Sequence, residues 1–328
     1  MQRILPLITF SITTAFPSTL FAQDYYAVTS CDQLVNIYNE NNNPLYVDII
    51  NDLDCTNTTT LVETLTGTIN GNGNSINNLN FQNERGYKLT NANLEKITFE
   101  NTSIHNEFSF KNLLDINDHW RNVTFTNLKT TGAPFDQLFY TISNKELTDV
   151  SIDLSGIKFA GVEGLLSSSI NRSTISNLKL LNGFISRKSS SPLSLLSNSM
   201  SDTSLTNVKL SNMTIIGQPT GRSGRTNIVG QISNSVVNSL TLENIIFSRS
   251  EEDAFFYDES DNQNSYNNIY HNLFDDTTDA RTISLVFKPE EDLSERIINF
   301  QSMNQPIQPP AMCTPYLLRD NYFGINAE

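Results

Sequence analysis

The feature that most constrains the fold of this chain is a repeated unit that recurs through its middle part. One copy, from Gly164 to Ile185, reads GLLSSSINRSTISNLKLLNGFI, and the next, from Ser194 to Ile215, reads SLLSNSMSDTSLTNVKLSNMTI. Weaker copies with the same plan, an aliphatic pair, a polar step and a short alternating strand, cover residues 112–130, 137–157 and 227–247. A unit of this length cannot bury an apolar face alone and must stack on its neighbours. The repetition therefore predicts a solenoid.

Each copy contains a strand in which apolar and polar residues alternate strictly, as in Val150-Ser-Ile152 and Leu178-Lys-Leu180. This period of two turns the apolar side chains inward and Ser, Thr or Lys outward. The first inward residues align at spacings of 18 to 32 residues as Leu79, Ile97, Val123, Val150, Leu178, Val208 and Leu240. Coils of this length, built from two or three short strands, predict an all-β fold, a parallel β-solenoid.

An antiparallel sandwich is the competing fold. It would place two-residue hairpin turns between adjacent strands, and Asn70-Gly71 and Asn182-Gly183 are candidates for such turns. These dipeptides follow no regular hairpin register along the repeat, so the pattern favours the solenoid.

Asparagine follows several of the strands, two residues past the second inward position. The residues concerned are Asn127, Asn182, Asn212 and Asn244. In a solenoid they would lie at a corner and could stack as amide ladders from coil to coil. The alternative is that they are ordinary turn formers, because Asn tolerates left-handed backbone conformations.

The two ends of the chain differ from the repeat. Residues 1–22 combine Arg3, an apolar stretch and a small-residue end before Gln23, which is typical of a secretory signal peptide. Residues 23–60 are expected to form an N-terminal cap and first strand. Within them Ser30 and Gln33 fit a capping box at the start of a short amphipathic helix, which would cover the open end of the stack. Residues 61–250 are expected to form the coils.

The C-terminal segment 251–328 begins with an acidic stretch, which predicts a long excursion from the stack. One more coil is expected at residues 281–287, and the prolines beyond Pro289 predict an irregular C-terminal cap. The acidic residues 251–261 could hold Ca²⁺, but they lack the ligand spacing of an EF-hand loop.

The chain has three cysteines, Cys31, Cys55 and Cys313. In an exported protein, Cys31 and Cys55 could form a disulfide worth about 3 kcal/mol in the chain-entropy model. The alternative is two free thiols. Cys313 would then be free or would pair with one of the other two.

The residues from Leu65 to Leu79, LTGTINGNGNSINNL, resemble the opening that precedes the repeats of GLUG-type bacterial surface proteins. Within the repeats, Gly164-Leu165-Leu166 and Asn177-Leu178 are similar to the consensus of that family. The resemblance covers about residues 25–250. It implies a right-handed parallel β-helix, a secreted or surface location (with the periplasm possible) and, often, adhesion. It transfers no catalytic residue.

Composition limits the partners. The formal charge of −14 disfavours nucleic acid, because binding its backbone requires a basic surface. No segment after the signal peptide is long and apolar enough to span a membrane, and no Cys/His cluster indicates a metal site. No cofactor is predicted. The expected partner is a glycan or a cell-surface protein, and the oligomeric state stays open.

Candidate binding residues lie outside the repeated positions. Aromatic side chains in the acidic excursion could pack back on the solenoid or offer stacking platforms to a ligand; they are Phe255, Phe256, Tyr257, Tyr266 and Tyr270. Arg222 and Arg225 form a basic loop that could contact an anionic glycan.

The alternative to binding is a polysaccharide lyase or glycoside hydrolase on the same scaffold. Hydrolysis needs two carboxylates at a fixed distance across the sugar, and the sequence alone brings no such pair together with Arg or Lys. A purely structural spacer is a third hypothesis. A binding, adhesin-like role is therefore the prediction, with no catalytic residue assigned.

Overall fold

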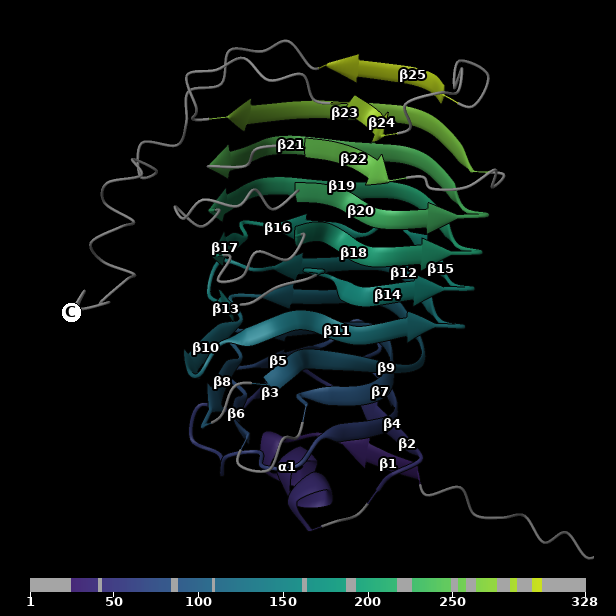
Figure 1. The fold of residues 1–328 in the computed structure, drawn as a ribbon. Helices are drawn as coiled ribbons and strands as arrows, with labels where there is room; N and C mark the ends of the chain where they lie inside the picture. Colours follow the sequence, from purple (N-terminus) through teal and green to yellow (C-terminus); the bar gives the residue numbers. More distant parts are fainter. Residues whose placement is uncertain are drawn as a thin grey trace, which may run out of the picture.

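The protein is a right-handed parallel β-solenoid, and every strand pair in it is parallel (Figure 1). The computed structural model describes residues 25–40, 43–83, 88–107, 110–160, 164–186, 193–216, 226–248, 253–257, 264–275, 284–287 and 297–302. The predicted fold class is confirmed, including the short N-terminal helix that lies against the first coil at the lower end of the stack in Figure 1.

Three groups of strands form the walls. One group contains the long strands that bend around a corner, together with their shorter counterparts: β1 (Tyr25–Val28), β2 (Tyr46–Ile49), β3 (Leu53–Asp54), β4 (Leu65–Asn70), β5 (Ser75–Asn77), β7 (Thr90–Glu100), β9 (Phe110–Thr126), β12 (Glu146–Asp153), β15 (Thr174–Ser176), β16 (Lys179–Leu181), β19 (Ser204–Ile216), β21 (Val236–Ser248), β23 (Ser265–Asp275) and β25 (Ile297–Ser302). A second group forms the wall that faces the viewer in Figure 1: β11 (Phe135–Ser143), β14 (Ser167–Asn171), β18 (Leu193–Ser201), β20 (Thr226–Ser233), β22 (Asp253–Tyr257) and β24 (Ser284–Phe287). A third contains a small sheet and two short strands: β6 (Asn80–Asn83), β8 (Ser103–Asn106), β10 (Lys129–Gly132), β13 (Phe159–Ala160) and β17 (Phe184–Ser186).

The alignment of inward residues predicts the register of the long strands correctly from the second copy onward. Ile97 pairs with Val123, Val123 with Val150, and Val208 with Leu240. The first member, Leu79, was wrong. Ile76 pairs with Phe99, the second inward position, and Leu79 lies beyond the corner. The Asn-Leu pair at 78–79 resembles later copies but occupies a different corner, which misled the alignment.

The core is a continuous apolar column along the axis. Its centre is Trp120, which is 0% exposed and donates its indole N–H to the Ala92 carbonyl at 3.0 Å. The Trp120 ring lies 5.5 Å from Phe125 and 5.2 Å from Phe139, and Phe99 stacks on Phe125 at 4.8 Å. Such aromatic pairs add stabilisation beyond their buried area.

The corners of the coils are formed by residues in the left-handed backbone region. Asn182, Asn212 and Asn244 have φ of 58°, 55° and 55°. Their amides are stacked as predicted: Asn212 donates to Asn182 at 3.1 Å, and Asn244 donates to Asn212 at 2.9 Å. Asn127 donates to Asn101 in the same way at 3.1 Å. Both readings of these asparagines are therefore correct, because each residue forms the turn and also bonds to the next coil.

Replacing Asn212 separates these two roles. Asn212→Ala should lower the free energy of unfolding by about 2 kcal/mol, because it loses the ladder bonds and because Ala tolerates a left-handed conformation less well than Asn. Asn212→Gly tolerates that conformation and should lose only about 1 kcal/mol. Urea denaturation of the two variants checks the order. Equal losses would contradict the role of the backbone conformation.

A second ladder, which the sequence did not reveal, lies inside the wall. The side-chain oxygen of one coil accepts the backbone N–H of the preceding coil: Ser173 accepts from Lys145, Thr203 from Ser173 and Ser235 from Thr203, at 3.1 to 3.4 Å. Asn264 continues the series by accepting from Ser235 at 2.9 Å. These bonds satisfy backbone donors at a buried corner, which would otherwise be costly.

The N-terminal cap has the predicted construction. Helix α1 (Cys31–Asn39) begins after Ser30, whose side chain accepts from the Gln33 N–H at 3.3 Å. The Gln33 side chain reaches back to the N–H of Thr29 at 2.9 Å, one residue before the expected partner. Leu34, Val35 and Tyr38 are buried against the stack.

The predicted disulfide between Cys31 and Cys55 is confirmed, with Cα atoms 5.2 Å apart. It ties the cap to the coil that follows β3. Replacing both cysteines by Ala should lower the free energy of unfolding by about 3 kcal/mol. Thermal denaturation with and without reductant checks this, because reductant should destabilise the natural chain and leave the double variant unchanged. Equal stability of the natural chain and the double variant in the absence of reductant would contradict the prediction.

The expected boundary near residue 250 was wrong. Strand β22 pairs with β20 and β23 pairs with β21, so residues 253–257 and 264–275 continue the stack. One more coil was expected at residues 281–287, and the structure describes strand β24 there, paired with β22. The acidic and asparagine-rich composition predicted a loop here, but strands β22 and β23 lie within this segment and pair with the preceding coil. The tail beyond Pro289, expected to be an irregular cap, contains strand β25, which pairs with β23, so residues 297–302 also continue the stack. The signal peptide at 1–22, the acidic residues 258–261, Cys313 and the rest of the C-terminal tail lie outside the described residues.

Candidate functional site

The outward side chains of the long strands form two straight rows, which we call the polar face. The pairing of successive strands places one residue of each coil in each row. The first row contains Tyr25, Tyr46, Thr68, Asn93, His119, Glu146, Thr174, Ser204, Val236 and Ser265. The second contains Asp48, Asn70, Glu95, Arg121, Thr148, Ser176, Thr206, Asn238 and Asn267.

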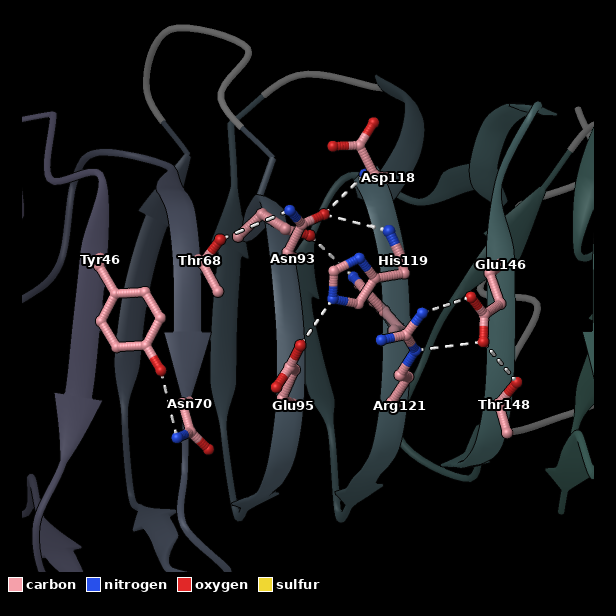
Figure 2. A network of polar contacts seen from close by, with 12 residues as sticks. Tyr46, Thr68, Asn70, Asn93, Glu95, Asp118, His119, Arg121, Glu146 and Thr148 are labelled. Atoms are coloured by element: carbon pink, nitrogen blue, oxygen red, sulfur yellow. Dashed lines mark hydrogen bonds and ion pairs between the residues drawn. The ribbon is translucent and has the colours of Figure 1, made fainter.

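Four ionisable side chains meet at the centre of the polar face (Figure 2). Arg121 binds Glu146 through two nitrogens, Nε at 3.1 Å and Nη2 at 2.6 Å. His119 Nε2 lies 2.8 Å from Oε1 of Glu95. Thr148 donates its hydroxyl to Glu146 at 3.3 Å. Three consecutive coils thus place two carboxylates, a guanidinium and an imidazole side by side.

A β-bulge positions this cluster. The register between β7 and β9 shifts between Ala92 and Leu94, so β9 carries extra residues opposite Asn93. The Asn93 carboxamide oxygen accepts the backbone N–H groups of Asp118 and His119, at 2.7 and 3.0 Å, and its side chain is 8% exposed. From the next coil Lys145 Nζ contacts the Asn117 carbonyl. Bulges re-aim side chains next to functional sites, and here the bulge turns His119 toward Glu95.

Within the cluster, Arg121 and Glu146 shift the pKa values of one another. The bidentate bond from Arg121 holds the pKa of Glu146 below its usual value of 4.5, and Glu146 in turn raises the pKa of Arg121. Nearby, Lys88 pairs with Asp115, and Lys145 lies 4.0 Å from Asp118. In the described part of the chain, the carboxyl groups whose pKa is displaced are Asp54, Glu146 and Glu243, and all three are displaced downward. The Glu146 carboxylate is therefore charged and acts as a hydrogen-bond acceptor.

The pKa of Glu146 is a measurable consequence of this geometry. Because its folded-state value lies below the unfolded value, its stabilising contribution is complete above about pH 4.5 and is lost as the pH falls through the folded-state pKa. The contribution is small, because the side chain is 38% exposed. In an NMR titration, Arg121→Gln should raise the pKa of Glu146. Lys209→Gln is the control and should raise only that of Glu243, its partner at 2.5 Å. An unchanged Glu146 in Arg121→Gln would contradict the pairing.

A stacked tyrosine pair lies at the N-terminal end of the polar face. The rings of Tyr25 and Tyr46 are 5.5 Å apart and inclined by 12°, and Tyr25 is 56% exposed. Tyr25 donates its hydroxyl to Asp48 at 2.6 Å, and the Asn70 amide bonds to the Tyr46 hydroxyl at 3.3 Å. The pair is thus an aromatic surface held rigidly among polar groups.

The site residues predicted from sequence do not form one site. Tyr266 is 0% exposed and faces the core opposite Val237, so its ring is not accessible to a ligand; the alternation of β23 points it inward. Tyr270 pairs with Thr241 on the adjacent wall, past the corner at Asn268. The backbone of Phe255, Phe256 and Tyr257 belongs to β22, and their side chains lie outside the described set. Arg222 and Arg225 lie outside the described residues.

The cluster that the structure brings together was missed, although a signal for it existed. Glu95, Arg121 and Thr148 each stand two residues before an aligned inward residue, namely Ile97, Val123 and Val150. His119 and Glu146 stand four residues before theirs. Reading the alignment outward as well as inward would have placed them on one face.

In the described ranges, no group of three or more His, Cys, Asp or Glu side chains is arranged to hold a metal ion. No described helix is both long and apolar enough to cross a bilayer.

Comparison of the chain with protein-family models, with curated proteins and with solved structures found no match. The resemblance to GLUG-type repeats therefore depends on the residues quoted for it above.

Proposed function

We propose that the protein is an exported carbohydrate-binding protein that holds a neutral glycan on its polar face, as an adhesin-like surface protein does. The observation that carries this proposal is the cluster of Glu95, His119, Arg121 and Glu146. It combines charged acceptors and donors, already bonded to one another, on a rigid wall. Sugar hydroxyls both donate and accept, so they match such a mixed set.

Charge favours a neutral glycan over an anionic one. The whole chain carries a net charge of −14, and Arg121 in the cluster, like Lys88 and Lys145 near it, is already paired with a carboxylate. A polyanion would have to displace these carboxylates while approaching an acidic surface. Pre-ordered polar groups on a sheet also reduce the entropy lost when a ligand binds.

The disulfide between Cys31 and Cys55 supports export, because disulfides persist in oxidising compartments. This agrees with the expected cleavage after Ala22 and with a secreted or surface location. N-terminal sequencing of the protein recovered from outside the cytoplasm checks it. A mature chain that begins at Gln23 is expected, and retention of residues 1–22 in the cytoplasm would contradict it.

A polysaccharide-active enzyme is the second candidate, because Glu95 and Glu146 lie on the same face with Arg121 between them. A glycosidase acid must be protonated near neutral pH, which requires a raised pKa. Arg121 instead lowers the pKa of Glu146. The pairing with Arg121 thus argues against Glu146 as the acid and supports its role as a hydrogen-bond acceptor in binding.

A glycan array, followed by a reducing-sugar assay on the glycans bound, tests the proposal. Arg121→Ala should weaken binding at least tenfold, whereas Lys209→Ala should not. Lys209 is a matched control, since it is also a surface cation paired with one glutamate. Release of sugar from a bound glycan would establish the enzyme instead, and binding of acidic glycans alone would contradict the neutral class.

A further inference from the structure

The polar face extends well beyond the charged cluster, and its shape carries information about the ligand. Past Glu146, the first row continues in constant register through Thr174 and Ser204 to Ser265. The second row continues through Ser176 and Thr206. The centre of the face is therefore ionic, and the part on its C-terminal side consists mainly of hydroxyl and amide groups.

This C-terminal part of the face is flat and ordered. The residues between the two rows, Leu147, Ile175, Leu205 and Val237, point inward and are at most 1% exposed. The hydroxyls of Thr148 and Ser176, on adjacent coils, lie 3.1 Å apart and are hydrogen-bonded. Short side chains anchored in this way leave a shallow surface that repeats once per coil.

The face is long in one direction only. Across the strands it is two outward residues wide, because the chain turns at a left-handed corner immediately after the second row, as at Asn177 and Asn207, with φ of 54° and 53°. Along the axis, neighbouring coils place equivalent groups about 4.8 Å apart. An extended β-1,4-linked pyranose chain advances by nearly the same distance per sugar, so its repeating hydroxyls can meet repeating donors and acceptors.

Resting on the function proposed above, we infer that the ligand is an unbranched, extended polysaccharide that lies parallel to the solenoid axis, with successive sugars over successive coils. The ionic cluster holds one segment of the polymer, and the hydroxyl rows hold the sugars that follow. At the opposite end, the exposed ring of Tyr25 offers a stacking surface to a sugar ring.

Oligosaccharide length series test this orientation. Calorimetric titration should use β-1,4-linked gluco- and manno-oligosaccharides from the disaccharide to the octasaccharide. Affinity should rise at least tenfold from the trisaccharide to the hexasaccharide, because the longer chain reaches more coils. Malto-oligosaccharides, which curl instead of extending, should show no such rise. An affinity that is the same for all lengths, or a rise only for the malto series, would overturn the inference. Failure of every series and of every neutral glycan on the array would overturn the proposed function itself.

A pair of matched variants locates the effect. Thr206→Arg places a bulky side chain on the second row, three coils or about 14 Å from Arg121. Thr241→Arg makes the same change on the adjacent wall. Thr206→Arg should lower the affinity for the hexasaccharide at least fivefold and leave the affinity for the trisaccharide unchanged. Thr241→Arg should change neither affinity. Equal weakening of both lengths by Thr206→Arg, or loss with Thr241→Arg, would contradict a ligand parallel to the axis. Circular dichroism of both variants confirms that each is folded.

Discussion

Val150→Asp should unfold the protein or lower its free energy of unfolding by more than about 4 kcal/mol, whereas Ser151→Asp should cost less than about 0.5 kcal/mol. The two residues are neighbours in β12 but face opposite sides of the wall. Val150 is 1% exposed and stacks between Val123 and the next coil. A carboxylate there would be buried among aliphatic side chains with no partner, which is among the costliest single changes.

Ser151 is a demanding control, because it differs from Val150 by one position. It is paired with Lys179 of the following coil, so an Asp at this position faces a cation. Denaturation followed by the fluorescence of the single tryptophan checks both variants. Similar losses in the two variants would contradict the register of the solenoid. A larger loss for Ser151→Asp would mean that Ser151, and not Val150, faces the core.

Trp120→Ala should lower the free energy of unfolding by about 3–5 kcal/mol. The substitution removes a fully buried indole that contacts aromatic rings in its own coil and in the next one. It also leaves the Ala92 carbonyl without the indole N–H, which adds a further cost. Because Trp120 contacts residues of three coils, its loss should weaken the packing of all three.

Trp120→Phe is the matched variant, because it keeps an aromatic ring but removes the N–H donor. It should lose about 2 kcal/mol, between the natural chain and Trp120→Ala. Since both variants lack the fluorophore, far-UV circular dichroism during urea denaturation supplies the measurement. A cost below about 1 kcal/mol for Trp120→Ala would show that the column is not packed around this residue.

The sequence allowed the wall and the cap to be predicted because their signals are local or repeated. The alternation around Val123, Val150 and Val208 reports which side chains turn inward, and repetition reports which coils pair. Ser30 and Gln33 mark the helix start through hydrogen bonds within four residues. The one register error, at Leu79, arose where a local Asn-Leu resemblance was not supported by the spacing of the coil.

The candidate site was harder to predict, because its residues are far apart in sequence and come close only through stacking. Glu95, His119 and Glu146 belong to three coils, and no local motif joins them. The bulge at Asn93 adds residues to β9, and this irregularity is what brings His119 within 2.8 Å of Glu95. The polar neighbours of the aromatic residues in the sequence indicated that their rings are exposed. For Tyr266 this prediction is wrong, because the period of its strand, and not its neighbours, determines that it faces the core.

Carboxyl footprinting in the presence of a saturating polysaccharide, selected on the array, tests most directly whether the glycan binds on the polar face. Labelling of Glu95 and Glu146 should fall strongly when the ligand is bound, because both lie on the polar face. Labelling of Glu100 and Glu243, which stand past the corner on the adjacent wall, should stay unchanged. Protection of Glu100 and Glu243 with continued labelling of Glu95 and Glu146 would contradict the account.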